Sequence, residues 1–275
     1  MNAPTTVTAT LQRTFGSGRI AVRRDGTGRT RLADLRQEGA LRLRLPRVAQ
    51  HAAPEAVLIN TAGGVTGGDR FDLEVQLGPG SELWVTSQAC EKVYRSVGGD
   101  AVQTVGLEVG TDACMVWLPQ PAILFDGSSY RRELNVEIEP GARLFALEAS
   151  VLGRAAMGER VTHCRLAERW RIRRQNRLLW ASEFALDDSR ALNAPAAMDG
   201  ARAFATFVVA GYDPELALAQ LRRLVDGWHG RAGVSAPGEV LVGMLLAPDA
   251  DGLMNDLRRL VEGFFARPMP RVWTC

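Results

Sequence analysis

The sequence predicts a mainly β fold, built from stacked strand-turn-strand units that form β-coil layers, with two α-helices in its C-terminal half. Three observations support this class. Residues 18–185 alternate apolar and polar side chains between Gly and Pro punctuation, a unit of about 30 residues recurs, and helical periodicity begins only after residue 185. We expect a single domain over 1–275: a disordered tail at 1–14, a β-stack at 15–185, and a strand and helix part at 186–275 packed on it.

The repeat is clearest at its Pro-Gly turns. Residues 75–85 (VQLGPGSELWV) align with residues 136–146 (VEIEPGARLFA), a weaker copy covers 107–117, and a fainter one runs over 170–178. The successive offsets are 32, 29 and 34 residues. Proline presets φ at one turn position and glycine permits positive φ at the next. Units of this kind bury a shared core only by stacking on one another.

Polar residues follow the second strand of each unit, and the repeat predicts that they stack in space. A row of this kind is either a set of solvent-facing strand ends or a polar groove along the stack, because buried polar groups are costly unless they are hydrated or paired. These residues are Ser87, Gln88, Gln120, Glu148, Ser182 and Glu183.

The C-terminal part reads as alternating strands and helices. Residues 203–210 form an apolar strand, and Asp213 followed by Pro214 is typical of a helix start. A second strand is expected at 238–247, and a second amphipathic helix at 249–265. The apolar Val272 and Trp273 near the chain end then dock either on their own domain or on a partner.

Composition excludes several classes of protein. The chain has 33 basic and 31 acidic residues and a net charge of +2, which argues against nucleic-acid binding through a bulk basic field. No apolar run approaches the length of about 20 residues that spans a membrane, and the N-terminus has no secretory signal, so we expect a cytoplasmic protein with free thiols. Lys92 is the single lysine among these basic residues.

Common catalytic motifs do not fit. The loop Gly63–Arg70 satisfies G-x-x-x-x-G, but Asp69 occupies the position where a phosphate-binding loop needs lysine. No G-x-S-x-G elbow occurs, and three His and four Cys match no zinc spacing. A hydrolase or isomerase that uses Glu148 or Asp69 as general base remains an alternative.

Four strings resemble one family when they are taken in order. They are TAGGVTGGD (61–69), VTSQACEKVYRS (85–96), WLPQPAILFDGS (117–128) and LEASVLGRAAMGE (147–159), with a closing PRVW. Over residues 15–273 the chain resembles the UreD (UreH) urease accessory proteins. The resemblance implies a non-enzyme with a β-coil fold and two helices. It also implies a complex with UreF and the GTPase UreG on apo-urease, in which the chain helps to deliver nickel.

Nickel(II) in transit needs ligands that also release it, and carboxylates, amides and hydroxyls hold it less firmly than His or Cys. Under the resemblance, the expected transient nickel ligands are Asp69, Glu148, Glu159 and Glu183. The expected channel lining is Ser87, Gln88, Gln120 and Lys92, and no cofactor is tightly bound. We place the UreF-facing surface at Phe264, Phe265, Val272 and Trp273. Alternatively, the chain only recruits UreF and nickel passes elsewhere.

Overall fold

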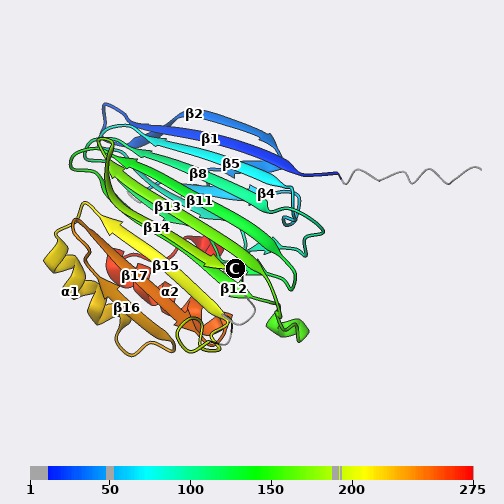
Figure 1. The fold of residues 1–275 in the computed structure, drawn as a ribbon. Coiled ribbons are helices and arrows are strands. Elements are labelled where there is room, and N and C mark those ends of the chain that lie inside the picture. Colours follow the sequence, from blue (N-terminus) through cyan, green and yellow to red (C-terminus); the bar gives the residue numbers. More distant parts are fainter. Residues whose placement is uncertain (1–11, 48–52, 188–191, 193, 275) are drawn as a thin grey trace, which may run out of the picture.

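The computed structural model describes residues 12–47, 53–187, 192 and 194–274. Two β-sheets face each other, and two helices cover the outer side of one of them (Figure 1). The predicted mainly β class is confirmed, because the strands coil between the sheets as a β-solenoid of about four turns. Most of the predicted N-terminal tail, together with Cys275, lies outside the described residues.

The first sheet has seven strands in the order β14-β13-β11-β8-β5-β1-β2. Its central strands run parallel, as expected when each turn of the coil adds one strand. Their bounds are β1 (Phe15–Arg24), β2 (Thr30–Gly39), β5 (Arg70–Leu77), β8 (Ala101–Val109), β11 (Ser129–Ile138), β13 (Arg165–Arg174) and β14 (Arg177–Leu186).

The second sheet runs in the order β16-β17-β15-β12-β9-β6-β4-β3, and short strands β7 (Glu91–Val93) and β10 (Ala122–Leu124) extend it beside β12. Its strands are β3 (Leu41–Arg44), β4 (Glu55–Asn60), β6 (Glu82–Ser87), β9 (Cys114–Leu118), β12 (Arg143–Leu152), β15 (Ala203–Ala210), β16 (Arg231–Ser235) and β17 (Val240–Ala247). The helices are α1 (Pro214–Val225) and α2 (Ala250–Phe265), with single 3-10 turns η1 (Ala155–Met157) and η2 (Arg271–Trp273).

The first three copies of the repeat stack in the predicted register. Leu107 pairs with Val75 on one side and with Val136 on the other, so equivalent positions of three units are neighbours. At the Pro-Gly turns, Gly80 and Gly141 have φ of 64° and 73°, and the chain crosses there from the first sheet to the second. These glycines are needed because a side chain rarely adopts positive φ.

The predicted fourth copy of the repeat, over residues 170–178, is wrong. Val136 lies beside Ile172 rather than Trp170, and the chain then returns within the first sheet, because β14 pairs antiparallel with β13. The turn at Gln175 and Asn176 explains the difference. Both residues have positive φ, of 48° and 64°, a conformation that closes a tight hairpin instead of leading to the other sheet.

Two cores hold these layers together. Between the sheets lie inward side chains of both, including Ile20, Leu107 and Leu144, all fully buried. On the other face of the second sheet, Phe145 and Phe207 pack with Leu257 of α2. The predicted strands at 203–210 and 238–247 and both helices are confirmed, whereas β16 was not foreseen. Within the described residues, neither helix is long and apolar enough to cross a membrane.

Each helix begins directly after an aspartate that caps it, as the sequence predicts for the first helix. The Asp213 side chain accepts a hydrogen bond from the Leu216 N–H at 2.9 Å, and Asp249 accepts one from the Gly252 N–H at 2.7 Å. Each cap satisfies a backbone donor of the first turn that has no partner within the helix. The caps fix where α1 and α2 start and therefore which faces they turn toward the second sheet.

Candidate functional site

A cavity of about 150 Å³ opens between the two sheets, beside the glycine loop and the ends of β6 and β7. Most of the surrounding core is apolar, so the polar groups that reach this space stand out. They come from four different parts of the chain: Asn60, Ser87, Gln88, Glu91, Lys92, Gln103 and Tyr130. We call this cavity the inter-sheet pocket.

The glycine loop forms one wall of the inter-sheet pocket by pairing with β7. The Val65 N–H donates to the Lys92 carbonyl at 2.8 Å, and the Tyr94 N–H donates to the Val65 carbonyl at 2.8 Å. Gly64 has a φ of 149°, and a Cβ there would stand 2.3 Å from the Tyr94 ring. The loop can close on β7 only because this residue is glycine.

Glu91 is the titratable group of the pocket wall. The Asn60 Nδ2 donates to its Oε1 at 3.0 Å. Burial raises the pKa of Glu91 to about 7, because loss of water outweighs this hydrogen bond. Lys92 lies at the rim with its side chain exposed. The pocket therefore holds a carboxyl group that changes its charge near neutral pH.

Ser87, Gln88 and Gln120 meet beside the pocket, as the repeat predicts for three of the six residues in its polar row. The Gln120 N–H donates to Ser87 Oγ at 2.8 Å, and its Nε2 donates to the Gln88 carbonyl at 3.0 Å. The same Nε2 donates to the Val272 carbonyl at 2.9 Å. Gln120 thus fastens the C-terminal segment to the ends of the second sheet's strands.

A cluster of three charged side chains lies deeper between the sheets, and we call it the buried triad: Arg132 of β11, Glu148 of β12 and Glu168 of β13. Arg132 Nη2 donates to Glu168 Oε1 and, at 3.0 Å, to Ser150 Oγ. Arg132 Nε lies 3.4 Å from Glu148 Oε2. The guanidinium therefore joins strands of both sheets across the core.

The pocket and the buried triad are adjacent. The Tyr130 ring lines the pocket, and its centroid lies 5.7 Å from the Arg132 guanidinium carbon. The Tyr130 hydroxyl donates to Gln103 Oε1. On the far side, the Trp117 Nε1–H donates to Glu148 Oε1 at 3.3 Å and fixes that carboxyl. Polar groups thus extend from the pocket rim to Glu148.

Electrostatics set the triad apart from the surrounding core. Burial raises the pKa of Glu148, and the nearby Arg132 only partly offsets this. Burial also opposes the charge of Arg132, but Glu168 and Glu148 hold its pKa above its usual value. Two carboxylates share one guanidinium, and Arg132 Nε and Glu148 Oε2 have no hydrogen-bond partner.

Asp69 is buried, but its oxygens serve the backbone. Oδ1 accepts from the Thr14 N–H at 2.7 Å and Oδ2 from the Thr66 N–H at 2.8 Å. The carboxylate therefore closes the glycine loop and joins it to the segment before β1. The structure does not place Asp69 in the pocket lining or in the buried triad.

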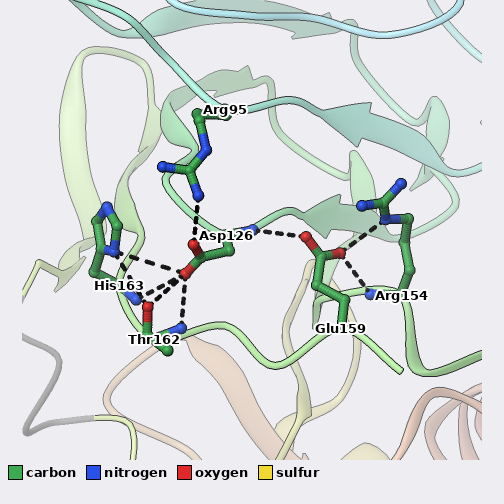
Figure 2. Close-up of polar contacts among 6 residues, drawn as sticks. All are labelled: Arg95, Asp126, Arg154, Glu159, Thr162 and His163. Carbon is green, nitrogen blue, oxygen red and sulfur yellow. Dashed lines mark hydrogen bonds and ion pairs between the residues drawn. The ribbon is translucent and has the colours of Figure 1, made fainter. Parts of the chain in front are cut away.

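Glu159 lies in the loop after β12, and both of its oxygens accept hydrogen bonds, one from that loop and one from the turn before β11 (Figure 2). Oε2 accepts from Arg154 Nε at 2.8 Å, and Oε1 accepts from the Asp126 N–H at 3.2 Å. Next to it, Asp126 accepts from Thr162 and pairs with Arg95 at 2.6 Å. Together these contacts brace the 153–163 loop against the turn before β11.

Glu183 is separated from the other predicted ligands. Its side chain is 67% exposed and pairs with Arg171 at 2.6 Å on the outer face of the first sheet. The prediction that Glu183 stacks with the other polar residues is wrong, because β14 forms a hairpin within the first sheet and the chain does not cross to the second sheet a fourth time. Ser182 is on the same strand and shares that displacement.

The four aromatic and apolar residues expected to face a partner pack at least partly on their own domain. Trp273 is buried, and its Nε1–H donates to Thr86 Oγ1 at 2.9 Å. The Phe265 ring lies edge-on to Trp84 at 4.8 Å, and Phe264 lies 5.7 Å from Phe145. Phe264, Phe265 and Val272 remain partly exposed. Of the two alternatives, Trp273 docks on its own domain.

The sequence reasoning missed Arg132, Glu168 and the burial of Glu91. A signal for the first two existed. In residues 129–138 the inward positions are Tyr130, Arg132, Leu134 and onward, and Glu168 likewise shares the phase of Leu166 and Trp170. Charged residues in the apolar phase of a strand indicate a buried polar site.

Cys90, Cys114 and Cys164 are free, as expected, and in the part of the chain that the structure describes no three His, Cys, Asp or Glu side chains are grouped to hold a metal ion. Glu91, Glu148 and Glu168 supply inward-facing carboxyl groups in and beside the pocket. Their arrangement can accept a cation or a proton, since it combines carboxylate, amide and hydroxyl oxygens in a confined space.

Comparison with known proteins gives a consistent result over almost the whole chain. A family model described as UreD urease accessory protein matches residues 15–274. A urease accessory protein UreD of Rhizobium leguminosarum bv. trifolii is 44% identical over 265 residues, which cover 95% of this chain and 96% of that protein. Proteins of the same name from Chelativorans sp. and Brucella suis are 44% and 42% identical, over 97% and 96% of this chain and 96% and 95% of their own lengths.

Proposed function

The chain belongs to the UreD family of urease accessory proteins, which gives it a role in urease maturation, and we propose that it acts there as a non-catalytic scaffold that conducts nickel(II) through its interior. The observation that carries the proposal is the row of polar groups between the sheets. It begins at the inter-sheet pocket, passes Tyr130, and reaches Glu148. An apolar core gains nothing in stability from such a row, because each polar group has to be desolvated.

The chemistry of the row suits a cation that passes through. It contains carboxylate, amide and hydroxyl groups, and the nearest thiol, Cys90, has its pKa raised by burial, which disfavours the thiolate form that binds nickel firmly. Oxygen ligands hold nickel(II) less strongly than thiolates or imidazoles do. A cation can therefore enter, be held briefly and leave.

We further propose UreF, UreG and apo-urease as the partners in this process. The partly exposed side chains at the end of α2 and after it, Phe264, Phe265 and Val272, are the surface proposed for UreF. Support comes from their apolar character and partial exposure, since exposed apolar side chains mark partner-binding patches. UreG would join through UreF, and the cytoplasm is the proposed location.

The test is co-expression of urease with its accessory proteins, including wild-type chain, no chain, Glu148→Gln or Glu183→Gln. Glu148→Gln keeps the shape of the side chain and removes its charge inside the row, whereas Glu183→Gln makes the same change on the outer face. We expect the complexes with wild-type chain and with either variant to assemble, and urease nickel content to fall only without the chain and with Glu148→Gln. Normal nickel content with Glu148→Gln would favour a chain that only recruits UreF.

One observation favours a second function. Glu91, with its pKa raised to about 7 in a pocket, has the property of a general acid or base. If the chain were a hydrolase or isomerase, its general acid or base would be Glu91 and not Asp69, because the oxygens of Asp69 accept hydrogen bonds from the backbone. It predicts that Glu91→Gln abolishes urease activation while the nickel content of urease stays normal. Loss of both together supports the nickel path instead.

A further inference from the structure

The buried triad has two carboxyl groups for one guanidinium, and part of its hydrogen-bonding capacity is unused. The side chains of Arg132, Glu148 and Glu168 are 6%, 4% and 5% exposed. Buried polar atoms normally have a partner, yet Arg132 Nε and Glu148 Oε2 have none, although they lie only 3.4 Å apart. A triad that served only to hold the sheets together would be expected to use these atoms.

From this arrangement we propose that Arg132 is an internal counter-cation that occupies a divalent-cation site formed by Glu148 and Glu168. An arriving nickel(II) ion displaces the guanidinium and binds both carboxylates, and the guanidinium returns when the ion leaves. The inference rests on the proposed function, since it assumes that nickel enters the row. It adds how the interior can bind the ion without retaining it.

The geometry supports a shared site. The single guanidinium lies between both carboxylates, so oxygens of Glu148 and Glu168 converge on one small volume. Glu148 comes from the second sheet and Glu168 from the first, and Trp117 holds Glu148 in place by its indole N–H. Glu148 therefore keeps a hydrogen bond that does not depend on Arg132, and the two carboxylates approach the site from opposite sheets.

The Arg132 guanidinium has alternative contacts available once a cation displaces it from the carboxylates. The Tyr130 ring lies 5.7 Å from it on the side of the inter-sheet pocket, and aromatic rings attract guanidinium groups. Arg132 Nη1 also donates to the Ala149 carbonyl at 3.3 Å, a contact that involves neither carboxylate. A rotation about the side-chain bonds can therefore release the carboxylates while Arg132 keeps polar contacts.

Competition by an internal cation lowers apparent affinity in a predictable way. If the guanidinium occupies the carboxylates about 90% of the time, the apparent dissociation constant for nickel rises by about tenfold. A divalent ion also supplies two charges to two carboxylates, whereas the guanidinium supplies one. The competition thus favours exchange with a passing ion over permanent storage of it.

The experiment measures nickel chloride binding to the purified full-length chain by calorimetry, with the nickel-dependent shift of the thermal midpoint as a second readout. Arg132→Gln removes the competitor and should tighten nickel binding by about tenfold. The triple variant Arg132→Gln, Glu148→Gln, Glu168→Gln has the same shape without charge and should lose this gain. Equal nickel binding by Arg132→Gln and the triple variant would overturn the proposal and leave the triad a structural link.

Arg132→Gln leaves two buried carboxylates unpaired, so its folding is itself informative. If it folds only when nickel is present, the proposal is supported. If it does not fold in either condition, Arg132→Lys decides: its single ammonium keeps a charge but lacks the planar fork that reaches both carboxylates. We expect severalfold tighter nickel binding than wild type, and unchanged binding contradicts the proposal. These binding measurements need no urease, so they test the Arg132 proposal separately from the nickel path. Either proposal can fail in its own experiment while the other is supported.

Discussion

Glu91→Gln should stabilise the protein at alkaline pH and have little effect at acidic pH. The Glu91 carboxyl lines the inter-sheet pocket, accepts one side-chain hydrogen bond from Asn60, and has its pKa raised by burial to about 7. In the unfolded chain the same group is hydrated and has its ordinary pKa of 4.5. The native state therefore binds the proton more tightly than the unfolded state does.

The size of the effect follows from the two pKa values. A tenfold difference in acid dissociation corresponds to about 1.4 kcal/mol, so the interval from 4.5 to about 7 is worth about 3 kcal/mol. Below pH 4.5 the carboxyl is protonated in both states and the folded state carries no penalty. As pH rises through 7 the native carboxyl is forced to ionise, and the free energy of unfolding is then lower by about 3 kcal/mol. Glutamine does not titrate, and its amide oxygen can still accept from Asn60.

The assay is urea denaturation of wild type and Glu91→Gln across this range. The variant should exceed wild type in free energy of unfolding by up to about 3 kcal/mol at about pH 9 and by little at about pH 5. Glu183→Gln, on the exposed outer face, is the matched control and should show no such trend. A difference between Glu91→Gln and wild type that does not change with pH would show that burial does not raise the pKa of Glu91 in the folded protein.

Two further predictions concern the C-terminal segment. Trp273→Phe should lower the free energy of unfolding by about 1–3 kcal/mol in urea, because it leaves the buried Thr86 hydroxyl without its 2.9 Å donor; a change near zero contradicts this account of the docked C-terminus. Val272→Asp should abolish co-purification with UreF, because it places a charge in the proposed apolar contact, whereas Leu216→Asp on the exposed face of α1 should not. Retained co-purification of Val272→Asp would move the contact elsewhere.

Much of the fold could be predicted because its rules are local. Alternation of apolar and polar residues marks strands, and Pro-Gly marks the crossings at Gly80 and Gly141. The helix cap Asp213 is read directly from residue type and position. Each of these features depends on neighbours in sequence.

The fourth crossing could not be predicted in the same way. Residues 170–178 carry an apolar pattern similar to that of the true repeats, but the path depends on the backbone of Gln175 and Asn176, which have positive φ. Pattern matching does not register this conformation. Glu183 was misplaced for the same reason, since it follows the hairpin into the first sheet.

The site was partly predictable. The repeat places Glu148 just after a strand, whereas β12 continues to Leu152 and carries Glu148 into the core. Its partners Arg132 and Glu168 come from neighbouring turns, and their meeting depends on strand register across 36 residues. The phase of the strands shows that each faces inward, but only the assembled sheets show which residues meet.

Passage of nickel(II) to urease through the space between the two sheets is the property on which the proposed function depends. The most direct test assembles the complex of this chain with its proposed partners, supplies nickel(II), removes free metal with an excess of chelator, and then measures the nickel bound by urease. We predict that urease still fills its sites with wild-type chain and with Glu183→Gln, and fails to do so with Glu148→Gln. Equal filling with Glu148→Gln and with wild type would contradict it.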